Sequence, residues 1–468
     1  MSTTDGASSR RASTQSANTE SPIGPLGGLE LEAEQIGAAM ADPGAPQTKV
    51  RRRYLVPLVA AYFALYVAWI TPIGFTLAIR VQQIDPEGKN TALALAVGIP
   101  GVIVVITSPL AGVLSDRTLS RFGRRRPWFF GGAMLGLIGS AMVGLAPSVA
   151  VVVIGWSIAY IGYSICGAMI LTHLSDLLPE QQRGKVAGIA GAVTQIGPIV
   201  GIVFAGAFVA IPFVMFAAPA AFAFVIGIVF VALMKDKPIT QRPGPVDVKG
   251  LLRGFYFNPR RYPNLGWVWI SRAFIFVALS FSTTYGVYLL GSRLGLAPAA
   301  IAGVAATVGG LSIIVAIGGA VLSGFLSDRL HSRKPFLIAS AIVLAAGMIV
   351  VATLTSATQY IVGGLLTSFA IGVYGAVDQA VQLDVLPHGE NQNGRYLGII
   401  QLANQVPQAV GPLLAGGLIA LAAGNYTIVY IAGAVVSVLG ALAIIPISIG
   451  RRALDSTTSI SLPNSRGN

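Results

Sequence analysis

The sequence predicts an all-α membrane protein with twelve transmembrane helices arranged in two six-helix repeat halves. Three observations lead to this fold class: the composition, a series of long apolar runs and an internal repeat. Of the 468 residues, 54% are hydrophobic and only 10% are charged, and the mean hydropathy is +0.74. A soluble protein of this length could not bury so many apolar side chains, so the composition indicates a membrane protein.

The apolar runs define the expected helices. A helix needs about 20 mostly apolar residues to cross a hydrocarbon core about 30 Å thick, and the chain contains about twelve such runs. The runs lack the apolar and polar alternation of barrel strands. The expected spans are residues 54–79, 92–114, 128–146, 150–173, 186–209, 213–234, 264–290, 301–326, 336–355, 358–382, 396–420 and 425–448.

The positions of the 31 Lys and Arg residues predict the orientation. Most of them lie before the first span, in the connections after even-numbered spans, or after the last span. The opposite side has only Arg80, Lys89 and Arg293. By the positive-inside rule, both termini are expected in the cytoplasm. The net charge of +13 therefore reflects orientation in a membrane, and no nucleic-acid partner is expected.

An internal repeat divides the spans into two halves. Three pairs of segments match in the same order, at offsets of 212, 208 and 210 residues. They are GVLSDR at 112–117 with GFLSDR at 324–329, DLLP at 176–179 with DVLP at 384–387, and TQIGPIVGIVFAG at 194–206 with NQVPQAVGPLLAG at 404–416. The expected domains are a disordered cytoplasmic tail (1–48), an N-terminal half (49–234), a cytoplasmic linker (235–263), a C-terminal half (264–450) and a second tail (451–468).

The connection after the second span carries a specific motif. It consists of Gly112, then Asp116 and Arg117, and then the Gly-Arg-Arg sequence at 123–125. The motif resembles that of the major facilitator superfamily, whose members have two parallel six-helix repeats. Five residues, 118–122, stand where the usual motif has one. This expanded form resembles the glycoside and sugar cation symporters and the plant-type sucrose transporters, and it implies secondary active transport by alternating access.

The chain departs from these sugar transporters at several positions. Val104 and Ser108 stand where the cation-coupled symporters have two sodium-binding Asp residues, and span 150–173 has no carboxylate. Because hard cations prefer charged oxygen ligands, the sodium site is expected to be absent, and the proton is the expected coupling ion. Leu171 replaces a substrate-linked Arg of the sucrose transporters, which counts against a sugar.

Charged and small residues at the helix ends are candidates for gating. A carboxylate such as Asp116 can pair with a nearby Arg or face a helix N-terminus, and such contacts break when the halves rock. The alternative is a solvated basic loop that only sets orientation. The expected gating residues are Gly112, Asp116, Arg117, Gly123, Arg124, Arg125, Asp176, Asp328, Arg329 and Asp384.

Ionisable residues within spans are functional candidates because they are costly in a membrane. Asp378, in the tenth span, suits proton coupling, or it could snorkel or form a static pair with Arg272. Arg272 could bind an anionic or hydroxyl-rich substrate, or could lie near the interface with a buried stem. His173 is expected at the interface and could alternatively carry a proton.

Uncharged polar residues supply further candidates for a substrate site. Tyr62, Tyr66 and Trp69 share one helix face, where they could stack on a sugar or pack against another helix. The repeat-related Gln195 and Gln405 lie on the fifth and eleventh helices. Amides need partners in lipid, so they should face a water-filled interior or the interface between the halves. The other expected amides of this kind are Gln379, Gln382, Gln401 and Asn404.

The sequence contains no phosphate-binding loop, HExxH or CxxC motif, and its one cysteine, Cys166, lies within a span. We therefore expect neither an enzyme nor a metal site. The preferred function is proton-coupled symport of a sugar or glycoside. The alternatives are proton-coupled efflux of drugs or metabolites, and a sensor that binds a ligand without transporting it. The expected partners are a small-molecule substrate and the lipid bilayer, for a monomer in a bacterial inner membrane.

Overall fold

The computed structural model of the protein describes most of the apolar part of the chain. The tails expected at 1–48 and 451–468, and most of the linker expected at 235–263, lie outside the described residues. The described residues are 52–177, 180–234, 236, 257–260, 262–330, 332–385 and 393–447.

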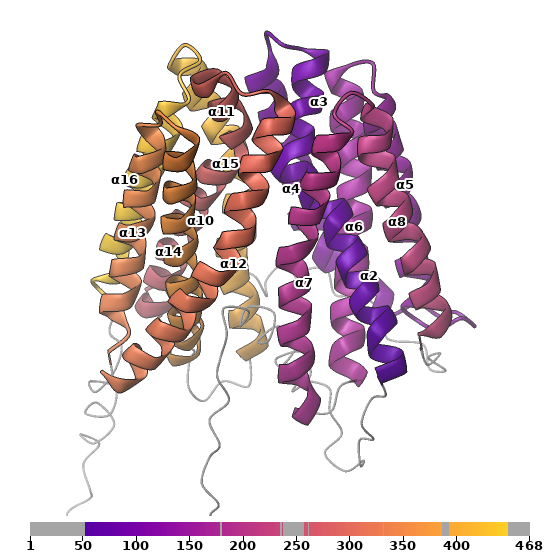
Figure 1. Cartoon of the computed structure of the whole chain (residues 1–468). Coiled ribbons are helices and arrows are strands. Elements are labelled where there is room, and N and C mark those ends of the chain that lie inside the picture. The colour runs from indigo at the N-terminus through magenta and orange to yellow at the C-terminus, as the bar shows by residue number, and fades with distance from the viewer. Residues whose placement is uncertain are drawn as a thin grey trace, which may run out of the picture.

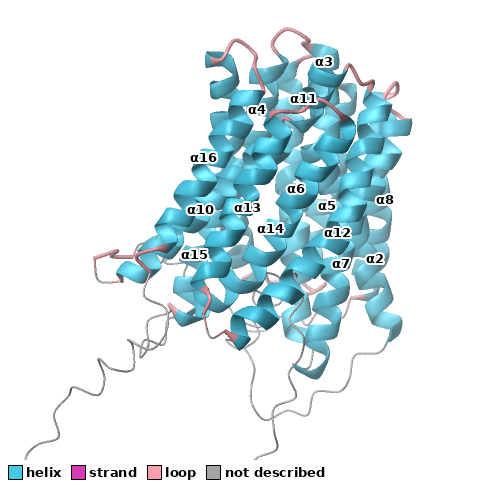
Figure 2. Ribbon diagram, turned by 60° about the vertical axis from the view of Figure 1, so that its left-hand side comes forward, coloured by secondary structure: helices cyan, strands magenta, loops and turns pink. Residues whose placement is uncertain are grey.

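The described residues form helices and no strands (Figure 2). The first span comprises α2 (Arg52–Thr71), the π-helix η1 (Pro72–Thr76) and α3 (Leu77–Ile84), and the seventh comprises α10 (Pro263–Thr284) and α11 (Gly286–Leu294). The other helices are α4 (Lys89–Asp116), α5 (Arg126–Leu145), α6 (Val149–Leu177), α7 (Glu180–Ala207), α8 (Pro212–Leu233), α12 (Pro298–Arg329), α13 (Lys334–Ala352), α14 (Ala357–Asp384), α15 (Asn393–Leu421) and α16 (Thr427–Ile444).

All twelve predicted spans fall on these helices, which confirms the predicted fold class. Eleven of the described helical segments are long and apolar enough to cross a membrane. The long helix that does not meet this criterion is α15, because it carries Gln401, Asn404, Gln405 and Gln408.

The prediction of one continuous seventh span, 264–290, is wrong. The helix is interrupted at Tyr285, between α10 and α11. The hydroxyls of Thr283 and Thr284 donate to backbone carbonyls one turn earlier, at 3.2 and 2.8 Å, and such bonds bend helices. At Gly286, an added Cβ would lie 2.4 Å from the hydroxyl oxygen of Tyr360, so α10–α11 passes close to α14 here.

The two halves repeat one packing pattern. In the N-terminal half, α5 packs on α6 and α8, α2 packs on α7 and α8, and α4 packs on α6. In the C-terminal half, α13 packs on α14 and α16, α10 packs on α15 and α16, and α12 packs on α14. Each of these main helix contacts in one half therefore has its counterpart in the other.

The halves meet along α4 with α15 and along α7 with α12. Figure 1 shows the N-terminal half in indigo to magenta and the C-terminal half in red to yellow, with ribbons that converge near α3, α4 and α11. The Arg-rich connection 117–125, together with Arg329, Arg333 and Lys334, lies at the other end of the bundle, which we call the basic end. The end where the ribbons converge is called the opposite end. A Cβ added to Gly101 of α4 would lie 2.9 Å from the Cα of Ala409, so small residues allow this close contact.

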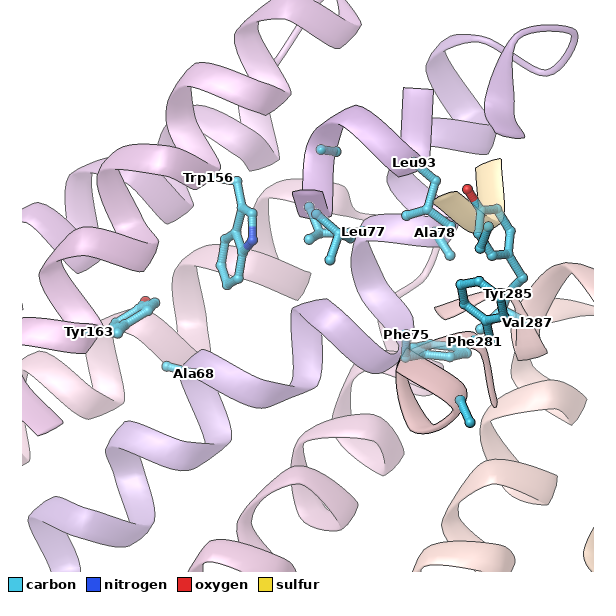
Figure 3. Packing of buried hydrophobic residues seen from close by; sticks show 14 of the residues in the cluster. Ala68, Phe75, Leu77, Ala78, Leu93, Trp156, Tyr163, Phe281, Tyr285 and Val287 are labelled. Carbon is cyan, nitrogen blue, oxygen red and sulfur yellow. The ribbon is translucent and has the colours of Figure 1, made fainter. Parts of the chain in front are cut away.

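A shared hydrophobic cluster holds the halves together toward the opposite end. Figure 3 shows part of it: Phe75, Ala78 and Leu93 of the N-terminal half lie with Phe281, Tyr285 and Val287 of the C-terminal half. All of these side chains are buried. This apolar packing does not explain the polar groups inside the spans, so they are the candidates for a function.

Candidate functional site

A buried ion pair joins Arg272 of α10 to Asp378 of α14. The guanidinium Nη1 donates to the Asp378 carboxylate, and the two side chains are only 5% and 7% exposed. Arg272 is therefore buried within the protein, where the expected pair with Asp378 is formed. Because each charge would be costly alone in the membrane, the pairing explains how both persist there.

Further polar groups surround Asp378. Gln382, one turn along α14, donates from Nε2 to the same carboxylate oxygen at 2.8 Å, and the Tyr374 hydroxyl also donates to the carboxylate. The Arg272 guanidinium carbon lies 5.4 Å from the ring centroid of Phe276. The Nε of Arg272 is buried and has no hydrogen-bond partner among the described residues. This N–H group could therefore donate a hydrogen bond to a ligand oxygen.

The ion pair connects helices that otherwise pack elsewhere. α10 packs mainly on α15 and α16, whereas α14 packs mainly on α12 and α13. A change in the protonation of Asp378 would therefore act on the relative position of α10 and α14. This arrangement can couple a proton to a helix movement.

A chain of aromatic rings occupies the corresponding helices of the N-terminal half, α2 and α6. Tyr62, Tyr66 and Trp69 follow one another along α2 with centroid separations of 5.1 and 5.8 Å. Trp69 then contacts Tyr160 of α6 at 5.8 Å, and Tyr160 stacks on Trp156 at 5.9 Å. The expected shared face is thus observed, and it packs partly against α6.

Two members of the aromatic chain keep an unused donor. The indole nitrogens of Trp69 and Trp156 are buried and have no hydrogen-bond partner among the described residues. Tyr160 and Trp156 were not among the expected site residues, although their i, i+4 spacing is the same as that of Tyr62 and Tyr66 and could have indicated them. The contacts between α2 and α6 reveal them.

Apart from Gln382, the expected amide side chains are either exposed or half-buried. Gln195 of α7 and Gln405 of α15 are exposed, and they lie on the helices that contact the other half. Asn404 and Gln379 are half-buried, and Gln408 donates to Asn404. Exposed amides in apolar helices are expected to face water rather than lipid, because lipid offers them no partners.

His173 lies near the C-terminal end of α6 and is buried among protein side chains. Its side chain is only 3% exposed, and its Nε2 is hydrogen-bonded to the hydroxyl of Tyr54 of α2. The His173 and Phe230 rings meet edge to face at 6.1 Å. The bond connects α2 to α6, just as the Arg272 ion pair connects α10 to α14.

At the basic end, Asp116 pairs with Arg residues of its own loop. Its Oδ1 lies 3.8 Å from Nη1 of Arg124 and 3.9 Å from Nη2 of Arg125. Arg125 is 2% exposed, whereas Asp116 is about 40% exposed. Arg117 ends α4 as its C-cap. A Cβ added at Gly112 would meet no neighbouring atom within 4 Å, so Gly112 is not required for packing in this conformation.

Asp236 is a structural partner that the sequence analysis missed. Its Oδ2 accepts the backbone N–H groups of Arg125 and Arg126, at 2.6 and 3.1 Å, and so caps the N-terminus of α5. Gly123 has a φ of +100°, and a Cβ there would lie 2.4 Å from the same carboxylate. The glycine of the motif therefore serves to admit this cap. Asp236 gave no signal because it is 111 residues from Arg125.

The basic end of the C-terminal half is built differently. Arg333 pairs with Asp384 at the end of α14 and also donates to the Ala380 carbonyl at 2.9 Å. Asp328 and Arg329, the counterparts of Asp116 and Arg117, are exposed. The side chain of Asp176, the counterpart of Asp384, lies outside the described side chains.

Among the described residues, three hydrogen bonds join the halves at the opposite end, and all three donors are tyrosines of the C-terminal half. Tyr288 donates to the Ala78 carbonyl at 2.8 Å and Tyr285 to the Asn90 carbonyl at 3.0 Å. Tyr426 donates to the Asn90 side-chain oxygen at 2.7 Å. Burial raises the pKa of Tyr426, which keeps its hydroxyl protonated as the donor. We call these residues the tyrosine latch.

The family follows from a match that covers both halves. The model of the Major Facilitator Superfamily matches residues 58–331 and 302–461. The chain belongs to this superfamily. It is therefore a multi-pass membrane protein with the fold of that family. Among the described residues, no group of three or more His, Cys, Asp or Glu side chains could hold a metal ion.

Similar curated proteins include transporters of different kinds. Multidrug resistance protein 3 of Bacillus subtilis is 35% identical over 106 residues, which cover 22% of this chain and 20% of that protein. The general alpha-glucoside permease of Schizosaccharomyces pombe is 26% identical over 130 residues, covering 26% and 22%. Multidrug resistance protein Stp of Mycobacterium tuberculosis is 26% identical over 162 residues, covering 34% and 28%. The matches thus span less than a third of each relative.

Solved structures support the fold. The nucleoside transporter NupG superposes with a TM-score of 0.66 and 14% sequence identity, covering 84% of this chain and 98% of that chain. A bacterial homologue of the human lysosomal transporter Spinster, in an inward-facing and unoccupied conformation, gives a TM-score of 0.60 at 15% identity, covering 84% and 94%. These similarities concern the fold alone.

Proposed function

We propose that the protein is a proton-coupled symporter that takes up a sugar or glycoside by alternating access. The observation that carries the proposal is the buried pair of Arg272 and Asp378, whose Arg keeps an unused donor. In this proposal the protein is a monomer in a bacterial inner membrane, and its basic end and both termini face the cytoplasm.

Proton coupling would operate by exchanging the partner of Arg272. Protonation of Asp378 removes its negative charge, so the attraction that holds the guanidinium is lost. Arg272 would then be free to donate to substrate oxygens, and the burial of a single positive charge would be compensated by the bound substrate. Release of the substrate would favour the return of the ion pair and the loss of the proton.

The aromatic and amide groups support a sugar or glycoside as the substrate. The rings of Tyr66, Trp69 and Tyr160 are only partly buried, and flat apolar ring faces can stack on the faces of sugar rings. The unpaired Trp69 indole and the exposed Gln195 and Gln405 amides could bind hydroxyl groups. The similarity to an alpha-glucoside permease agrees with this class.

Alternating access would use both ends of the interface. The tyrosine latch joins the halves at the opposite end, so it would have to break for that end to open. The ion pairs of Asp116 and Asp384 each lie within one half at the basic end. These residues would exchange partners when the basic end closes.

Uptake by proteoliposomes tests the proposed substrate class. Purified protein is reconstituted with an imposed inward proton gradient, and the accumulation of radiolabelled maltose, sucrose and an aryl glucoside is measured. We expect accumulation of at least one glycoside above its outside concentration, and loss of accumulation when a protonophore collapses the gradient. If no glycoside accumulates while the gradient persists, the proposal is wrong.

Efflux by proton antiport is a second candidate, favoured by the 35% identity over 106 residues with a multidrug resistance protein. The same vesicles distinguish efflux from symport. Proton-driven movement of a lipophilic dye in the direction opposite to the proton, without glycoside uptake, would establish efflux in place of symport. Wild-type vesicles that transport glycosides but not the dye would exclude it.

A further inference from the structure

The loop between α4 and α5 is longer than its counterpart in the C-terminal half. The two halves align at an offset of 212 residues from Gly112 to Arg117, but at 208 residues at Pro127 and again at Asp176. The N-terminal loop therefore has four residues without counterparts. They lie within residues 118–122. Figure 1 shows this loop in purple beside the lower end of α8, at the side of the bundle.

The inserted loop is a folded turn fixed to the helix ends. The Trp128 indole of α5 donates to the Thr118 hydroxyl at 2.7 Å, and that hydroxyl donates to the Leu114 carbonyl of α4 at 2.9 Å. Within the turn, Ser120 accepts the Phe122 N–H at its side chain and the Gly123 N–H at its carbonyl, both at 3.1 Å. The orientation of its side chains is therefore set by hydrogen bonds at both ends.

This turn presents apolar side chains outward. Leu119 is 48% exposed and Phe122 is 57% exposed. Arg121 is exposed as well, and its guanidinium carbon lies 4.8 Å from the Phe122 ring centroid. Placing two large apolar side chains in water is unfavourable by about 25 cal/mol per Å² of apolar surface, so an apolar environment is expected on this side.

Exposed apolar side chains continue from the turn into both helices that it connects. Leu110 and Leu114, in the last two turns of α4, are 41% and 48% exposed, and Phe130, in the first turns of α5, is 46% exposed. The turn connects these two helices. An aromatic ring, an aliphatic side chain and an Arg at the end of a span are the combination found at the boundary of hydrocarbon and headgroups.

We propose that loop 118–122 is a membrane anchor that binds anionic phospholipid. Leu119 and Phe122 insert between the headgroups, and Arg121 pairs with a lipid phosphate while stacked on the Phe122 ring. The charge favours an anionic bilayer surface, and the small size of the turn disfavours a protein partner, which would require a contact of about 800 Å². The anchor fixes the α4–α5 end in the bilayer plane, independently of which solute the protein transports.

The depth of a spin label tests the anchor. A nitroxide is attached at Leu119→Cys in a Cys166→Ala background, with Arg121 and Phe122 intact, in vesicles of phosphatidylcholine with phosphatidylglycerol. We expect the label to be accessible to oxygen and shielded from a water-soluble nickel chelate. A label at Ser332→Cys, in the shorter counterpart loop, provides the reference and should be accessible to nickel. Nickel accessibility at position 119 equal to that at position 332 would overturn the proposal.

Two second-site changes separate the parts of the anchor. Adding Phe122→Ser should raise nickel accessibility at position 119 in every lipid mixture, because the ring no longer holds the turn in the interface. Adding Arg121→Gln should lower the preference for phosphatidylglycerol over phosphatidylcholine about fivefold, as expected for the loss of one Arg near an anionic surface. An unchanged lipid preference would refute the role of Arg121. Both positions are exposed, and unchanged thermal unfolding checks that each variant is folded.

Discussion

Individual residues combine structural and functional roles in this transporter. Arg272 and Asp378 stabilise each other in the C-terminal half, yet the same pair leaves a donor of Arg272 unused. Gly123 belongs to the family motif, and its positive φ makes room for the carboxylate of Asp236. In both cases the local geometry explains why a costly or restricted residue occurs.

Removing one member of the buried ion pair should destabilise the protein. Arg272→Gln leaves the Asp378 charge without its partner, and the loss of one member of a buried pair costs about 3 kcal/mol. The double variant Arg272→Gln and Asp378→Asn removes both charges and should recover most of that loss. Thermal unfolding of the detergent-solubilised protein measures both. Equal destabilisation in the single and double variants would contradict a direct pairing.

The Gly123→Ala change should weaken the basic end of the N-terminal half. The substitution combines a positive φ, which costs about 1 kcal/mol, with a Cβ that would displace the cap on α5. Asp236→Ala should cost a similar amount, because a helix cap contributes about 1 kcal/mol. If the glycine serves the cap, the two changes together cost less than their sum. Strict additivity in thermal unfolding would argue against this link.

At the scale of the element, the sequence was most informative where one helix carries the whole signal. Apolar length located all twelve spans, and the repeat indicated two halves with equivalent packing. The break at Tyr285 was not predicted, because the hydroxyl bonds of Thr283 and Thr284 beside it are seen only in the folded helix. Asp236 was missed because its partners, the backbone N–H groups of Arg125 and Arg126, are far away in the sequence. Trp156 and Tyr160 stack on each other within α6, so their i, i+4 spacing was a usable signal.

The contact between α5 and α6 predicts a difference between two glycines of one helix. A Cβ at Gly139 would lie 2.4 Å from backbone atoms of α6, whereas a Cβ at Gly131 would meet nothing within 4 Å. Gly139→Ala should therefore destabilise the protein by about 1 to 3 kcal/mol, as overpacking does. Gly131→Ala is the matched control and should be neutral or slightly stabilising. Similar unfolding temperatures for both variants would show that the close contact is not important.

At the scale of the whole molecule, the two halves are similar in packing but unequal in their polar groups. The N-terminal half contributes aromatic rings and a Tyr54–His173 bond, whereas the C-terminal half contributes the Arg272–Asp378 pair. The tyrosine latch joins them at the opposite end. Such an arrangement suits a rocking motion in which the latch and the ion pair change together.

Weakening the latch should favour opening of the opposite end. Tyr426→Phe removes one hydrogen bond between the halves, worth about 1 kcal/mol, which corresponds to about a fivefold shift between the two states. Spin labels at Glu87→Cys and Ala299→Cys, in a Cys166→Ala background, report the separation of the halves, and the longer distances should gain population. Tyr163→Phe is the matched control, because Tyr163 bonds to Ser140 within one half. No shift, or an equal shift in the control, would contradict a role as a latch.

The central claim, coupling at Asp378, is tested most directly by proton entry into proteoliposomes that contain a pH-sensitive dye. Addition of the transported glycoside outside should acidify vesicles with the wild-type protein and with Glu87→Gln, an exposed carboxylate variant. Asp378→Asn keeps the shape of the side chain but cannot take up the proton, and it should abolish the acidification while still binding the glycoside. Acidification by Asp378→Asn at the wild-type rate would show that the proton is coupled elsewhere.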